Sequence, residues 1–218
     1  MAISSARAPR RRDALSRQRI VEAAIELLDA EGESGLTVRA LTSHLSTGRG
    51  AIYHHVEGVD DLLAAAADDV IRAATAHTAD GADPNTALRD LSLGIFDALD
   101  AHPWVGAQLA REPRQPAVLR IWKGIAVHLR RLGVDGRARS DAGAALANYI
   151  FGSAAQFAAG ARHASDPAER RDYLDALASA WTEQDTDEVV RGAASHLRDH
   201  DDREQFMAGI DIFLKGIS

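Results

Sequence analysis

Apolar residues recur every three or four positions along most of the chain, which is the spacing of amphipathic helices. The first such stripe starts after Ser16, a residue type preferred at helix N-caps, and stops at Gly32, a residue type that favours the left-handed C-cap. Its apolar members are Ile20, Ala24, Leu27 and Leu28. The pattern predicts a helix from Ser16 to Glu31.

Two short helices and a longer one are expected next. The expected segments are a helix over 37–44, a turn over 45–47, a helix over 48–55 and a helix from 59 to about 77. Thr37 is a suitable N-cap for the first of them, and Ile52 points inward from the second. The acids at the start of the longest helix suit the positive end of its dipole.

The chain keeps helical periodicity to its end. The further expected helices cover 85–101, 103–111, 116–132, 140–163, 167–183, 187–199 and 203–217. Because no segment alternates as a strand does, we expect an all-α fold with about nine to eleven helices. The expected regions are a flexible basic arm over 1–13, a small helical domain over 14–63 and a larger helical domain over 64–218.

Charge is divided unevenly along the chain. The net charge is −7, yet residues 1–56 carry eight Lys and Arg against six Asp and Glu. The segment 37–56 contains Arg39 and Arg49 and no acid. A local cationic face is enough to attract phosphate, and an acidic remainder directs that face toward a polyanion. The pattern favours a nucleic-acid partner for the front of the chain.

Several classes of protein are disfavoured by what the sequence lacks. With no cysteine it has no disulfide, thiolate metal site or cysteine nucleophile, which fits a reducing cytoplasm. It contains no G-x-S-x-G, no H-E-x-x-H and no phosphate-binding loop motif, and its nine histidines lack metal-site spacing. We therefore expect no enzyme, no cofactor and no metal.

Membrane association is not expected either. Residues 1–12 have arginines but no apolar stretch behind them, unlike a secretory signal. The segment 142–161 is free of charge, but it is rich in Ala and Gly and only weakly apolar for a membrane span. We expect it to be a helix buried on nearly all sides, with small residues allowing close packing.

The segment 37–55 meets the physical demands of a helix-turn-helix. Leu41, Leu45 and Ile52 are expected to form a small core that fixes the angle between its helices, with the small residue Thr42 at their closest approach. The second helix would then present polar and basic groups to a major groove. Arg49 suits either guanine or phosphate, and both interpretations stay open. The candidate DNA contacts are Thr37, Arg39, Thr47, Gly48, Arg49, Gly50, Ala51, Tyr53 and His54.

The stretch RIVEAAIELLDAEGESGLTVRALTSHLSTGRGAIYHHVEGVDDLL resembles the DNA-binding domain of the tetracycline-repressor family without a gap. The most specific match is Gly50-Ala51-Ile52-Tyr53-His54-His55-Val56. The resemblance implies that Tyr53 and His54 contact the sugar-phosphate backbone. Three positions depart from the family pattern: Ser46 replaces the usual Gly, Thr47 a common Val, and Val59 the usual Lys. Valine cannot pair with phosphate as that lysine would, and we expect the arginines of the N-terminal arm to compensate.

The resemblance continues more weakly into the larger domain. It implies a homodimer in which the helix at 140–163 and the last helix form a four-helix interface with their two-fold mates. The candidate interface residues are Tyr149, Phe157, Phe206, Ile210, Phe213 and Leu214. Burial of these residues within a single chain is the alternative. Two DNA-binding modules about 34–36 Å apart would read a near-palindromic operator.

Members of the resembled family generally hold a small molecule in the helical body. The candidate pocket residues are Phe96, His102, Trp104, Leu119, Trp122, Asn148 and Phe151, since aromatic side chains with a few polar groups suit an apolar ligand. Each could equally be plain core. Leu109 would occupy the position of the metal-binding His of the tetracycline repressor, which disfavours a magnesium–tetracycline ligand.

Together these features predict a ligand-responsive transcriptional regulator in the cytoplasm, associated with the nucleoid. Its expected partners are a double-stranded DNA operator, a second copy of the chain and a small, mainly apolar effector. A repressor is the favoured form. An activator, or a DNA-binding regulator without an effector, remains the alternative.

Overall fold

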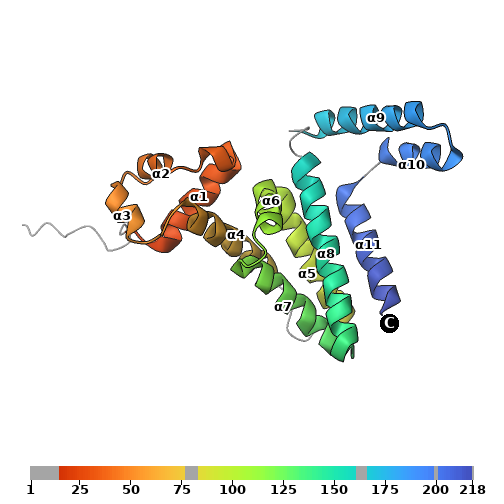
Figure 1. Cartoon of the computed structure of the whole chain (residues 1–218), viewed down its shortest axis with the longest axis horizontal. Coiled ribbons are helices and arrows are strands. Elements are labelled where there is room, and N and C mark those ends of the chain that lie inside the picture. The colour runs from red at the N-terminus through yellow and green to blue at the C-terminus, as the bar shows by residue number, and fades with distance from the viewer. Residues whose placement is uncertain (1–14, 77–82, 161–165, 199–200, 218) are drawn as a thin grey trace, which may run out of the picture. The chain divides into compact units, whose positions relative to one another are not determined.

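The computed structural model describes residues 15–76, 83–160, 166–198 and 201–217, so the predicted basic arm at 1–13 lies outside the described residues. Within the described residues there are eleven α-helices, one short 3₁₀ turn and no strand (Figure 1). This confirms the all-α prediction. The chain divides into two compact units, Met1–Ala66 and Ala67–Ser218, and each is described by itself.

The N-terminal unit is built from short helices on a small apolar core. Its elements are α1 (Arg17–Glu31), the 3₁₀ turn η2 (Glu33–Gly35), α2 (Val38–His44), α3 (Arg49–Tyr53) and the start of α4 (Val59–Thr75). The Ser16 hydroxyl accepts a hydrogen bond from the Arg19 amide at 3.2 Å, and Gly32 ends α1 with a φ of +69°. The fully buried core residues are Ile20, Ala24, Leu28, Leu41, Ile52 and Leu62.

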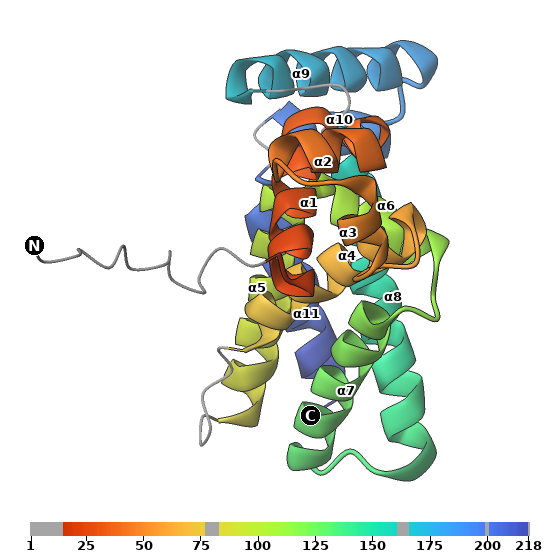
Figure 2. The same cartoon turned by 90° about the vertical axis from the view of Figure 1, so that its left-hand side faces the viewer.

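The C-terminal unit contains the remaining helices. They are α5 (Pro84–Ala101), α6 (Pro103–Arg111), α7 (Pro116–Arg131), α8 (Gly136–Gly160), α9 (Pro167–Gln184), α10 (Glu188–Arg198) and α11 (Asp202–Gly216). Helix α8 packs on α6 and α7, while α5 packs on α7 and α11. Helices α9 and α10 pack chiefly on each other and lie side by side at one end of this unit (Figure 1 and Figure 2).

Two contacts tie the second half of α4 into the C-terminal unit. A Cβ on Gly94 of α5 would lie 2.7 Å from the Ala74 carbonyl oxygen, so glycine is needed for this close approach. Arg120 of α7 donates two hydrogen bonds, of 3.1 and 3.0 Å, to the carboxylate of Asp68 in α4. The planar guanidinium matches a carboxylate in this two-bond geometry. The helix that begins in the N-terminal unit is thus held by α5 and α7.

Helix α11 is attached to α5 by apolar and ionic contacts. Phe206, Ile210 and Leu214 lie on its buried side, and the Phe206 ring is 5.1 Å from that of Phe96 in α5. Further pairs join Arg89 to Asp211 at 2.7 Å and Arg203 to Asp97 at 3.1 Å. These pairs are half-exposed or exposed, so the apolar contact dominates the attachment. No helix in the described part of the chain is long and apolar enough to cross a membrane.

Candidate nucleic-acid interface

The angle between α2 and α3 is fixed by a compact turn. Leu41 and Ile52 are buried as predicted, whereas Leu45 is only half-buried. The amide of Thr47 donates to the Thr42 carbonyl at 3.0 Å, and Ser46 adopts a φ of +50°. Among the described residues, Ser46 is the one non-glycine residue with positive φ. A glycine, the usual residue at this position in the family, would adopt this conformation without strain, so Ser46 adopts it at an energetic cost.

The hydroxyl groups of α2 serve the helix framework. Thr37 Oγ1 accepts from the Ala40 amide at 3.1 Å, which confirms that Thr37 is an N-cap. Its own hydroxyl proton stays available to a phosphate oxygen. Thr42 Oγ1 donates to the Arg39 carbonyl at 2.9 Å. The predicted small residue at the turn therefore also stabilises it.

Two side-chain pairs link the helices of the N-terminal unit and engage two of its acids, Glu26 and Asp61. His44 Nε2 of α2 lies 2.8 Å from Glu26 Oε2 of α1. Arg17 of α1 lies 3.1 Å from Asp61 of α4, whose second carboxylate oxygen accepts from the Glu57 amide at 3.2 Å. Since these acids are engaged within the framework, they compete little with an external anion for the free arginines.

The outward side of α2 and α3 carries unpaired cations. Thr37, Arg39, Arg49, Tyr53 and His54 are all exposed, and the Tyr53 side chain is 55% exposed. Within the described residues no ion pair engages the guanidinium of Arg39 or Arg49. Thr47 is half-buried and lies at the edge of this surface. Of the predicted DNA-contacting residues, all except the half-buried Thr47 are exposed, and they lie in α2, in α3 and at the caps of these helices; we call this exposed set the α2–α3 face.

Two glycines of the α2–α3 face have no role in packing. A Cβ on Gly48 or Gly50 would meet no atom within 4 Å. Gly50 lies inside α3, where glycine costs roughly 1 kcal/mol relative to alanine. Gly48 is explained by its place at the N-cap of α3, where glycine is among the preferred residues. Gly50 has no such role in the fold, and its missing side chain leaves the backbone of α3 open to the close approach of an outside surface. Helix α3 is also shorter than predicted, because Gly48 is its N-cap and His54 its C-cap.

The predicted ligand pocket is only partly assembled. Phe96 and Trp104 are buried, and His102, Trp122 and Phe151 are half-buried. Leu119 is 70% exposed, because the buried side of α7 is formed by Val118, Ile121 and Ile125 instead. Asn148 is exposed on the outer side of α8. The pocket prediction is therefore wrong for Leu119, whereas Asn148 lines a groove between α8 and α11 and not an interior pocket.

The predicted dimer residues of α11 also need correction. Phe206, Ile210 and Leu214 are 3%, 0% and 4% exposed in a single protomer, so they have almost no surface left for a second chain. Their apolar stripe covers α5, in line with the alternative of burial within one chain. Phe213 is half-buried, and the side chain of Phe157 lies outside the described residues. Assigning Phe206, Ile210 and Leu214 to the dimer interface is therefore wrong.

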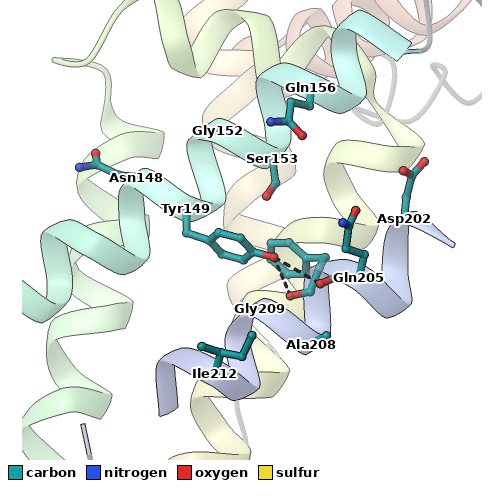
Figure 3. Close-up of a pocket in the computed structure, with 11 residues that line it drawn as sticks. Asn148, Tyr149, Gly152, Ser153, Gln156, Asp202, Gln205, Ala208, Gly209 and Ile212 are labelled. Carbon is teal, nitrogen blue, oxygen red and sulfur yellow. Dashed lines mark hydrogen bonds between the residues drawn. The ribbon is translucent and has the colours of Figure 1, made fainter. Parts of the chain in front are cut away.

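A groove of about 500 Å³ opens between α8 and α11 (Figure 3). Tyr149 crosses it from α8, stacks on Phe206 at 5.4 Å and donates a hydrogen bond to the Phe206 carbonyl at 3.0 Å. Burial raises the pKa of the Tyr149 hydroxyl, which therefore stays a donor at neutral pH. A Cβ on Gly209 would overlap this hydroxyl oxygen. Ile212, missed by the sequence analysis, lines the groove and is 72% exposed.

Buried polar groups of the body were also missed. Gln108, Gln115 and His128 are buried, and each has a side-chain atom without a hydrogen-bond partner among the described residues. Burial, followed by the charge of Arg131, lowers the pKa of His128. No sequence pattern points to these groups, since Gln115 before Pro116 indicates only a helix start.

The comparisons with known proteins agree with this geometry. The sequence model described as "Bacterial regulatory proteins, tetR family" matches residues 20–66. A transcriptional regulator of Streptomyces coelicolor, described as a TetR, is 44% identical in sequence, with a TM-score of 0.81 over 94% of this chain and 98% of that chain. The chain therefore belongs to the tetR family of bacterial regulatory proteins. It is a transcriptional regulator with a helix-turn-helix DNA-binding unit and not an enzyme, as predicted.

Two further matches are more distant. An HTH-type transcriptional regulator of Saccharopolyspora erythraea is 30% identical over 140 residues, covering 64% of this chain and 59% of that protein. The chain thus spans about three-fifths of the length of that curated relative. The structure of ActR from Streptomyces coelicolor in complex with actinorhodin has a TM-score of 0.76 at 21% identity, covering 93% of this chain and 95% of that one. At this identity the likeness concerns the fold alone.

Proposed function

We propose that this regulator is a repressor that binds a near-palindromic operator as a homodimer and is released by a small, mainly apolar effector. The observation that carries DNA binding is the α2–α3 face. It combines two unpaired arginines with two glycines that the packing of the chain does not require. Because this activity requires DNA, we expect the protein in the cytoplasm, at the nucleoid.

The roles on the α2–α3 face follow from chemistry and exposure. Arg49 and Arg39 supply cations to phosphates, and Arg49 also reaches a guanine edge if α3 enters the major groove. Tyr53, His54 and the Thr37 hydroxyl are suited to the sugar-phosphate backbone. Gly48, Gly50 and Ala51 allow the backbone of α3 to come close to the bases, with Thr47 at the edge.

The test is operator binding measured by fluorescence anisotropy, on a site obtained by selection from random duplexes. Replacing Arg49 by Ala should weaken binding about 10-fold or more, because it removes one good interaction with a base or a phosphate. The matched control is Arg137→Ala, whose side chain is 93% exposed on α8 and far along the chain from the helix-turn-helix. Equal binding by both variants would refute the assignment of the α2–α3 face.

The dimer proposal rests on the outer side of α8 and α11, which we call the α8–α11 face. Its exposed members are Ala145, Asn148, Gly152 and Ala155 of α8 and Gln205, Ala208 and Ile212 of α11. Segment 142–160 carries no charge, and small side chains permit close helix approach. A two-fold pairing would cover this face and bring Ile212 of each chain toward the groove of the other. Tyr149 and Phe213, at its border, keep their predicted interface role.

Effector release is proposed because α4 connects the DNA-binding unit to the helical body. Its second half is held by α5 at Gly94 and by α7 through the Arg120–Asp68 pair. A ligand that prefers a different arrangement of these helices would change the position of α4 in proportion to its differential affinity. Phe96, Trp104, Trp122, Phe151 and His102 remain the candidate pocket residues.

A further inference from the structure

The corner where α6 ends and α7 begins contains two buried glutamines. Gln108 of α6 is 5% exposed, and Gln115, which directly precedes α7, is 4% exposed. In the described part of the chain, the Oε1 atom of each has no hydrogen-bond partner. Ser92, another buried polar residue, differs because its hydroxyl donates to the Leu88 carbonyl at 2.8 Å. The two glutamines therefore present unused acceptors inside the helical body.

The orientation of Gln115 is fixed by chemistry. Its Nε2 donates to the Gln108 carbonyl at 2.9 Å, and a carbonyl oxygen only accepts, so exchanging the amide nitrogen and oxygen would break this bond. The same carbonyl accepts from the Glu112 amide at 3.2 Å and is already well used. The hydrogen bond of Nε2 therefore holds the Gln115 amide in place, while its Oε1 remains without a hydrogen-bond partner among the described residues.

Unpaired acceptors at buried positions are unusual. Nearly all buried polar groups in proteins have partners, and an apolar side chain of the same shape would avoid the penalty of burial. The other buried positions of α6 and the first turn of α7 are apolar or glycine, among them Trp104, Leu109 and Val118. The nearby acid Glu112 is paired with Arg114 at 3.1 Å and is partly exposed. The site offers neutral acceptors in apolar surroundings, which suits an uncharged donor.

We infer that Gln108 and Gln115 bind a hydrogen-bond donor of the effector, and that this effector is an aromatic or otherwise apolar molecule with a hydroxyl or amide N–H group. The inference rests on the proposed ligand response and names the class of ligand for it. A ligand without the donor leaves both acceptors buried and unpaired, so the site discriminates against it.

The same corner is linked to α4. Helix α7 begins at Pro116, directly after Gln115, and Arg120 on its second turn holds Asp68 of α4 through two hydrogen bonds. A donor that binds Gln115 would shift the first turn of α7, the helix that carries Arg120. Occupation of the corner is therefore communicated to α4 through Arg120.

The experiment compares alcohols with their methyl ethers as probes. The full-length protein is titrated with β-naphthol, para-phenylphenol and the methyl ether of each, and binding is measured by calorimetry and by the shift in melting temperature. We expect each alcohol to bind about fivefold more tightly than its ether, the effect of roughly one net hydrogen bond. Gln108→Met should reduce this preference, because methionine fills similar space without the acceptor while Gln115 keeps its own.

The matched control is Gln184→Met at the exposed end of α9, which should keep the preference. Gln115→Met serves as a second variant if Gln108→Met fails to fold. Equal binding of alcohol and ether to the wild type, no binding of any probe, or a preference that is unchanged in both corner variants would overturn the inference.

Operator binding, followed in the same samples, separates the two proposals. An alcohol that binds with the expected preference but leaves the operator complex intact supports the donor site and contradicts ligand release. Release by alcohol and ether alike supports the proposed function and overturns the donor site.

Discussion

The α2–α3 face and the α8–α11 face are both exposed in a single protomer, and their chemistry differs. The first presents the unpaired cations Arg39 and Arg49, with no acid over 37–56. The second presents small residues, two neutral amides and the apolar Ile212, and none of these carries a charge. Phosphate is attracted by the first kind of surface, and a second protein chain is accommodated by the other kind. Exposure in one chain thus indicates a different partner in each unit.

The inward faces of the two units are much more alike. Leu41 and Ile52 fill the core of the N-terminal unit, as Phe206 and Ile210 fill that between α11 and α5. A large apolar stripe therefore marks the chain's own core in both units. The partner surfaces that we propose lie among the residues left outside, which differ between the units in size and charge.

An acid on each face should remove a different partner, and the largest effect is expected for Ala51→Glu. Ala51 is exposed on α3, so the substitution should leave the melting temperature nearly unchanged. A carboxylate directed at phosphates is repelled, and operator affinity should fall about 100-fold or more. Anisotropy titration gives the affinity, and sedimentation should find the wild-type oligomeric state. A variant that binds the operator normally would contradict the role of the α2–α3 face.

Ile212→Glu should have the opposite profile. Two-fold symmetry places the new charge in the interface twice, so the dimer should dissociate about 100-fold more readily, with operator affinity reduced as a consequence. Analytical ultracentrifugation over a concentration series measures the dissociation. Val189→Glu on α10 is the control, since Val189 is 79% exposed and outside the α8–α11 face. If Val189→Glu dissociates the dimer and Ile212→Glu does not, the interface lies elsewhere.

Gly209→Ala tests the border between inward and outward faces of α11. The added Cβ would overlap the Tyr149 hydroxyl, so the ring must leave its stack on Phe206. We expect a decrease of about 1–3 kcal/mol in the free energy of unfolding, measured by urea denaturation. Gly192→Ala, within α10 and with open space around its Cβ, should instead stabilise by up to about 1 kcal/mol. Destabilisation of equal size by both changes would count against the Tyr149 contact.

The smallest effect is expected from His128. Because burial lowers its pKa in the folded chain, protons bind the unfolded chain more readily. Stability from this group is present above the ordinary histidine pKa of about 6.5 and is lost as the pH falls below it. His128→Gln should therefore lose less stability than the wild type between pH 7 and about pH 5.5, by under about 1 kcal/mol. If the stability of the two proteins changes with pH in the same way, protonation of His128 does not cause the loss.

Helix positions and the DNA-binding unit could be predicted well from the sequence, for physical reasons. Caps such as Ser16 and Thr37 act locally, so their effect on helix starts is visible in the sequence. The start of α8 was misplaced because Gly133 and Gly136 both take positive φ, and the helix begins at Gly136 rather than near residue 140. Local sequence determines where a helix begins, but with two glycines close together it does not show which of them precedes or starts the helix.

The sequence was a poor guide to which helix face meets which partner. Periodicity identified the stripe of Phe206, Ile210 and Leu214 but could not tell α5 from a second chain as its cover. Leu119 is among the predicted pocket residues, although the turn of α7 directs it outward. The unpaired oxygens of Gln108 and Gln115 depend on neighbours that only the folded chain defines. Long-range packing decides each of these points.

The absence of charge over 142–160 has a consequence for pairing fidelity. A host with several related regulators needs each protomer to find its own kind, and complementary charges commonly enforce such selectivity. The small neutral side chains of α8 provide no pattern of complementary charges. In a homodimer formed through this surface, discrimination against paralogues would depend on shape: the bulge of Ile212 and the hollow beside Tyr149. A few substitutions at these two points would then be enough to create a new, separately pairing regulator.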